Sequence, residues 1–160
     1  MIVTRDIPEQ VWPELTLYRL VPTTPAALYE LLTDYSHIAS YNPGIISAEV
    51  ISQPTPTSKH IRYTAKVPVL SNIVYTVNND YSEKNGVYQI RWNLLESPMA
   101  SASTGSMTME LLGNQTLLRY VNHVTPSMPM AGLLKGQALT EAKSTMDSIT
   151  NEAIRRAKKK

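Results

Sequence analysis

The sequence predicts an α+β fold: one curved antiparallel sheet of seven strands, two short helices after the first strand, and a long helix at the C-terminal end. Three observations predict it. Alternating apolar and polar residues recur in segments joined by short turns, which is typical of an antiparallel meander. An early helical segment is interrupted and then stopped. The end of the chain keeps helical spacing after Pro126 and Pro129, with no further proline to break it.

Length and composition place the chain among globular proteins. It has 160 residues, of which 42% are hydrophobic and 18% charged, so we expect a single domain over 1–160. The absence of cysteine excludes disulfides, thiolate nucleophiles and cysteine-based metal sites.

Charge is concentrated at one end of the chain. The net charge is +2, yet the basic C-terminal end, 155–160, carries five positive charges. Such an end can contact nucleic acid or an anionic membrane, or simply complement the dipole of a solvated helix end. We expect the last: no nucleic-acid partner and at most peripheral membrane contact. The oligomeric state is not predicted.

Targeting and membrane signals are absent. No run approaches the roughly 18 apolar residues of a membrane span, and the lead-in, 1–13, has no apolar signal-peptide core. We therefore expect a soluble protein, either cytoplasmic or periplasmic after removal of a signal not present in this chain.

The first elements follow from local signals. Residues 14–21 (ELTLYRLV) alternate and predict a strand. Thr24 is placed to cap a helix that has Pro25 at its first position and continues over 26–33.

A second short helix is expected over 35–41. Asp34 is interpreted as its cap rather than as an acid catalyst. Pro43 and Gly44 end it, because the residue before a proline avoids the α region.

The following segments change to strand periodicity. Asn85-Gly86 and Gly113-Asn114 are expected to form tight turns, and QPTPTS (53–58) is a further turn. The remaining six strands are predicted over 45–51, 60–67, 72–81, 87–95, 100–112 and 115–125.

One long helix, 131–157, is expected to close the chain, with a length of roughly 40 Å. Its apolar stripe is narrow, and half of its residues are alanine. The stripe consists of Leu134, Ala138, Ala142, Met146, Ile149 and Ala153.

Several stretches together resemble a known family: PAALYELLTDYSHIASYNPGI, VPVLSNIVYTV, NGVYQIRW, GSMTMELLGNQTLLRYV and TPSMPMAGLLKGQAL. They resemble the helix-grip fold of the START/polyketide-cyclase (SRPBCC) superfamily, and they cover nearly the whole chain from about Leu15. The resemblance implies a deep apolar cavity between the curled sheet and the long helix, with the two short helices plugging one end. The pollen-allergen branch has a glycine-rich loop between its second and third strands. The corresponding turn here, QPTPTS, contains no glycine, so no role of that loop is carried over to this chain.

Ligand-binding residues are expected on the walls of this cavity. Among them, the amide of Asn122 and the tyrosine hydroxyls need partners, which are either protein groups and water or a bound ligand. The expected binding residues are Tyr63, Tyr75, Trp92, Met107, Tyr120, Asn122, Leu134, Ala138, Ala142 and Met146.

Catalytic signatures are missing. There is no nucleophile elbow and no phosphate-binding glycine motif, so no cofactor is expected. The three histidines, His37, His60 and His123, lie on different elements and predict no metal site. Strand parity places Arg62, Arg91 and Arg119 on the face opposite the apolar residues.

The sequence therefore favours a soluble carrier or sensor for a small apolar ligand such as a lipid, quinone, sterol or polyketide. The alternative is a cyclase- or dehydratase-type enzyme acting on an aromatic or polyketide-like substrate, which needs an acid–base group inside the cavity. A third hypothesis is an interaction module that uses the basic end. An ionisable residue at the centre of the cavity would favour the enzyme, and an apolar lining would favour the carrier.

Overall fold

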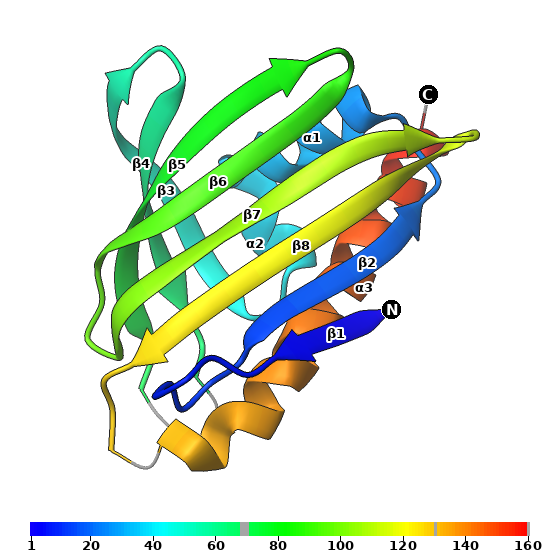
Figure 1. Cartoon of the computed structure of the whole chain (residues 1–160). Helices are drawn as coiled ribbons and strands as arrows, with labels where there is room; N and C mark the ends of the chain where they lie inside the picture. Colours follow the sequence, from blue (N-terminus) through cyan, green and yellow to red (C-terminus); the bar gives the residue numbers. More distant parts are fainter. Residues whose placement is uncertain (68–70, 130, 160) are drawn as a thin grey trace.

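The computed structural model describes residues 1–67, 71–129 and 131–159. Its elements, in chain order, are β1 (Ile2–Arg5), β2 (Glu14–Val21), α1 (Pro25–Thr33), the 3₁₀ turn η1 (Tyr35–His37), α2 (Ile38–Tyr41), β3 (Ile45–Thr55), β4 (Ser58–Ala65), β5 (Ile73–Lys84), β6 (Val87–Glu96), β7 (Ala100–Leu112), β8 (Gln115–Pro126), the 3₁₀ turn η2 (Ala131–Leu134) and α3 (Lys135–Ala157). The strands form one curved sheet, and the helices all lie on one side of it (Figure 1).

The predicted α+β class and antiparallel sheet are confirmed, but the sheet has eight strands rather than seven. Its order is β1-β2-β8-β7-β6-β5-β4-β3. The extra strand is β1, which lies in the expected lead-in and pairs antiparallel with β2. Four residues are too few for alternation to reveal a strand, and β1 exists because β2 offers it an edge.

The start of α1 follows the local signals. The Thr24 Oγ1 accepts a hydrogen bond from Ala27 N at 3.3 Å, and Pro25 occupies the first turn. Leu28, Leu31 and Leu32 face the core and are buried. Their spacing of three and one places them on one side of the helix.

The predicted role of Asp34 is wrong in detail. The short helix after it has no side-chain cap from Asp34. The carboxylate instead accepts hydrogen bonds from Ser36 Oγ at 3.0 Å, His37 Nδ1 at 2.8 Å and Arg156 Nη2 at 3.0 Å. Asp34 thus links the corner between the two short helical segments to the end of α3.

The hairpin turn at Asn85-Gly86 forms as predicted, but the turn predicted over 53–58 is shorter than expected. Asn85 and Gly86 have φ values of 54° and 78°, as a tight hairpin turn requires. β3 runs on to Thr55, so only two residues of QPTPTS remain between β3 and β4. Because β3 is an edge strand, Pro54 is tolerated there.

The core lies between α1, the rear of α3 and one half of the sheet. Its buried cluster includes Leu15 and Leu17 of β2, Met109 and Leu118 of the central strands, and Met146 of α3. None of the helices in the described part of the chain is long and apolar enough to cross a membrane.

The basic end is more structured than a solvated helix end. Arg155 donates from Nη2 to Glu152 Oε1 at 2.5 Å, and Arg156 donates from Nε to the same oxygen at 2.8 Å. The Glu152 residue is only 5% exposed. Lys160 lies outside the described residues.

Candidate functional site: a cavity between the sheet and α3

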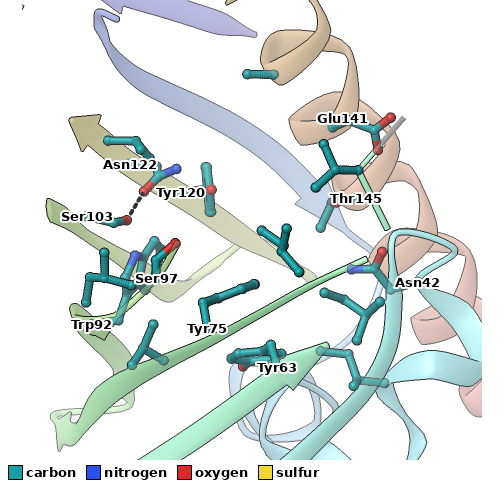
Figure 2. A pocket seen from close by; sticks show the side chains of 18 of the residues that line it. Asn42, Tyr63, Tyr75, Trp92, Ser97, Ser103, Tyr120, Asn122, Glu141 and Thr145 are labelled. Atoms are coloured by element: carbon teal, nitrogen blue, oxygen red, sulfur yellow. Dashed lines mark hydrogen bonds between the residues drawn. The ribbon is translucent and has the colours of Figure 1, made fainter. Parts of the chain in front are cut away.

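A cavity of about 490 Å³ lies between the sheet and α3. This volume falls within the roughly 300–1,000 Å³ of small-molecule sites. Strands β4 to β8 form one wall, α3 forms the opposite wall, and η1 and α2 contribute the end (Figure 2).

Eight of the ten predicted binding residues line this cavity. The strand residues do so because alternation with period two puts every second side chain on the same face. The eight are Tyr63, Tyr75, Trp92, Met107, Tyr120, Asn122, Leu134 and Ala138.

The other two, Ala142 and Met146, lie outside the cavity. Met146 is 3% exposed in the core beside β2, and Ala142 packs against the same cluster. Each step of four residues turns about 40° around a helix with 3.6 residues per turn. The three successive steps of four from Leu134 to Met146 therefore carry the predicted stripe out of the cavity after Ala138. Glu141, Thr145 and Ile149 line the cavity further along α3, and of these only Ile149 belongs to the predicted stripe.

Aromatic rings form much of the sheet-side wall. Tyr63 and Tyr75 stack with ring centroids 5.2 Å apart, and Trp92 lies 5.6 Å from Tyr120. The position of Trp92 depends on Gly105, its partner on β7. A Cβ atom at Gly105 would overlap the indole ring and the Val121 carbonyl oxygen, so only glycine lets Trp92 lie flat on the sheet.

Two hydrogen-bonded groups of uncharged polar side chains interrupt the apolar sheet-side wall. At the first, Ser103 Oγ donates to Asn122 Oδ1 at 3.5 Å, and the amide is turned toward Tyr120 (Figure 2). At the second, Asn79 Nδ2 donates to the Tyr35 hydroxyl at 2.9 Å, and Tyr35 and Tyr81 share a hydrogen bond of 2.5 Å.

The second polar group was missed by sequence reasoning although a signal existed. Asn79 has the same parity on β5 as Tyr75 and Val77, which face the cavity. Its partner Tyr35 comes from η1, 44 residues away in sequence, and only the fold brings the two together.

Two further lining residues come from connecting segments. Trp12 donates from Nε1 to the carbonyl of Ala131 at 2.8 Å, which ties the lead-in to η2. Asn42 is buried and accepts from Gly44 N at 3.1 Å. The only tryptophan of the lead-in, 1–13, was the available signal for Trp12.

Burial keeps the phenols of the cavity neutral. It raises the pKa of Tyr75 to about 12, and it raises the pKa values of Tyr63 and Tyr120 as well. Neutral phenols donate hydrogen bonds but do not accept protons from a substrate near neutral pH.

Charged side chains reach the cavity only at its rim. Among the described lining residues these are Lys66 and Glu141, and both are exposed. In the same described ranges, no three histidine or carboxylate side chains gather in a way that could hold a metal ion.

Comparison with known proteins identifies the family. Residues 21–148 match the model of the family described as "Polyketide cyclase / dehydrase and lipid transport". The chain belongs to this family. No curated protein matches the sequence.

Solved structures share the fold at low sequence identity. A STAR-related lipid transfer protein from Xanthomonas axonopodis superposes with a TM-score of 0.84 at 13% identity, over 95% of this chain and 92% of the other. The Zhui aromatase/cyclase from a Streptomyces species gives 0.79 at 16% identity, over 90% and 94%. Human STARD10 gives 0.84 at 12% identity, over 98% and 70%. These likenesses show the START-like helix-grip fold.

Proposed function

We propose that this family member is a carrier or sensor that holds one small, mainly apolar ligand, such as a lipid, quinone, sterol or polyketide, in the cavity. The observation that supports it most is the distribution of charge: the interior is apolar and aromatic with uncharged polar groups, and the charged Lys66 and Glu141 stay on the exposed rim. Similar structures include proteins named for lipid transfer as well as an aromatase/cyclase.

The size of the hydrophobic contribution is sufficient for binding. A ligand that buries about 300 Å² of apolar surface gains about 7 kcal/mol at roughly 25 cal/mol/Å². Association and ordering offset part of this gain. The polar groups of the wall therefore need to add only a few hydrogen bonds to reach micromolar affinity, which corresponds to about 8 kcal/mol.

The alternative is a cyclase- or dehydratase-type enzyme, and the Tyr120 hydroxyl beside Asn122 is the observation that favours it. Cyclisation and dehydration need a general base as well as a hydrogen-bond donor. The raised pKa of Tyr120 keeps it a donor, and the described interior supplies no carboxylate or histidine as the base. The carrier is the better supported of the two functions.

One pair of variants tests the carrier function. Ala138→Trp fills the cavity, whereas Ala142→Trp places the same side chain in the core beside it. We expect Ala138→Trp to abolish uptake of N-phenylnaphthylamine, an uncharged dye that fluoresces in apolar surroundings. Ala142→Trp should keep dye uptake and lose about 1–3 kcal/mol of stability through overpacking.

The two outcomes separate clearly. A folded Ala138→Trp protein that takes up the dye as well as the unmodified chain contradicts the proposed site. If Ala142→Trp fails to fold, the smaller Ala138→Leu still gives a graded test, with weakened rather than abolished uptake. Native mass spectrometry of the purified protein would identify a ligand that is retained from the cell.

A further inference from the structure

The polar groups of the cavity wall are arranged in order along the sheet. The strand register places Asn122, Gly105, Trp92 and Asn79 in one row across β8, β7, β6 and β5. Trp92 lies flat on Gly105 and so separates the two amides. Asn79 is 5% exposed and already donates to Tyr35, whereas Asn122 is only half-buried beside the cavity. Of the two amides in this row, Asn122 is therefore the one available to a ligand.

Asn122 and Tyr120 act as a pair. They occupy alternate positions of β8 and so share its inner face. One amide atom of Asn122 is held by Ser103, and the rest of the amide is turned toward Tyr120 (Figure 2). Both side chains line the cavity, and burial keeps the Tyr120 phenol neutral by raising its pKa.

This arrangement leaves two donors for a ligand. The Asn122 oxygen already accepts from Ser103 Oγ, which leaves the NH₂ as the donating part of the amide. The neutral phenol of Tyr120 carries a second donor on the same face of β8, and both side chains line the cavity. Two such donors suit the two lone pairs of a carbonyl oxygen.

We infer that the ligand presents an uncharged carbonyl oxygen to Asn122 and Tyr120, so that the site takes neutral ketones, esters and quinones and rejects the corresponding carboxylates. This inference rests on the proposed carrier function and narrows its ligand class. The hydrogen bonds orient the ligand, and the apolar wall supplies most of its affinity.

Rejection of carboxylates follows from the position of the charges. A buried anion needs a paired cation, because its desolvation is otherwise uncompensated. Among the described lining residues the one cation is Lys66, which is exposed at the rim and follows β4, a strand well separated from β8 in the sheet. A carboxylate at Asn122 would therefore have hydrogen bonds but no counter-charge.

The test compares three ligands of one shape by isothermal titration calorimetry at neutral pH: the acetyl, ethyl and carboxylate derivatives of naphthalene. We expect the acetyl compound to bind about three- to tenfold more tightly than the ethyl compound, the range of one or two net hydrogen bonds. The carboxylate should bind at least about tenfold more weakly than the ethyl compound.

Variants assign the preference to its residues. Asn122→Leu and Tyr120→Phe should each bring the acetyl-to-ethyl ratio of affinities close to one. Tyr18→Phe removes a hydroxyl from the opposite face of β2 and should keep the ratio of the unmodified chain. Thermal unfolding of each variant shows that it is folded.

The possible results are distinct. Equal binding of the acetyl and ethyl compounds, or tightest binding of the carboxylate, overturns the carbonyl inference and leaves the carrier function standing. The carbonyl inference is also overturned if both site variants keep the acetyl preference. If none of the three compounds and no dye enters the cavity of the unmodified chain, the carrier function itself fails.

Discussion

The front half of α3, 135–145, and its rear half, 146–157, belong to one continuous helix but pack differently. In the front half no side chain is buried, and several face the cavity. In the rear half Met146, Ile149, Glu152 and Ala153 are buried. Asp147 of the rear half also pairs with Arg19 of β2.

The two halves of α3 therefore have different roles: the front half lines the cavity, and the rear half packs into the core. A side chain that lines a cavity has fewer protein atoms around it than a core side chain and so makes fewer dispersion contacts within the protein. The front half therefore depends on the rear half, which is held by the core and by the bonds of Glu152 and Asp34 to Arg156. Segments with few buried contacts open at lower free energy than the core, and we expect the front half to be the part of α3 that responds to a ligand.

The largest effect should come from removing a core side chain of the rear half. Met146→Ala is expected to lower the free energy of unfolding by about 3 kcal/mol, because it leaves a cavity in a buried cluster. Leu139→Ala, at a half-buried position of the front half, should lower it by only about 1 kcal/mol. Urea unfolding measures both, and equal losses would contradict the division of the helix.

The next largest effect on stability is expected at Glu152. Its pKa is lowered from 4.5 to about 2, and the hydrogen bond from Arg155 is the largest cause. A folded-state pKa below the unfolded value stabilises the protein above about pH 4.5, and this stability is lost as the pH falls from 4.5 toward 2. Glu152→Gln should remove about 2 kcal/mol at neutral pH. It should also flatten the acid limb of the stability curve, and an unchanged limb would show that another carboxylate is responsible.

Hydrogen exchange sharpens the comparison within the unmodified protein. Backbone amides of 137–145 should exchange at least about tenfold faster than those of 149–156, a difference of about 1.4 kcal/mol in opening free energy. A bound apolar ligand should slow the front half more than the rear half. Uniform protection along α3 would mean that the helix opens as one unit.

The smallest effect is expected at the bond between Asp34 and Arg156. Their side chains are 28% and 32% exposed, so solvent screens the pair. A double-mutant cycle with Asp34→Asn and Arg156→Gln should give a coupling energy of about 0.5–1 kcal/mol. Dye uptake should not change, and its loss in a folded Asp34→Asn protein would assign Asp34 a part in binding.

Much of the site could be predicted because strands have a strict period. Tyr120 and Asn122 were placed on the cavity side from alternation alone, and both lie there. The helix stripe was less reliable, because residues at spacing four turn gradually around the helix. For that reason Ala138 lines the cavity and Ala142 does not.

The sequence by itself determined the local elements of this protein: the cap at Thr24, the hairpin turn at Asn85-Gly86, and the inner face of each long strand. These depend on neighbours within a few residues. The tertiary structure alone decided which distant groups meet, such as Trp12 with Ala131 and Asp34 with Arg156, 119 and 122 residues apart. It also decided the volume of the cavity, because sheet curvature and the packing of α3 against the core set the space that side chains leave unfilled.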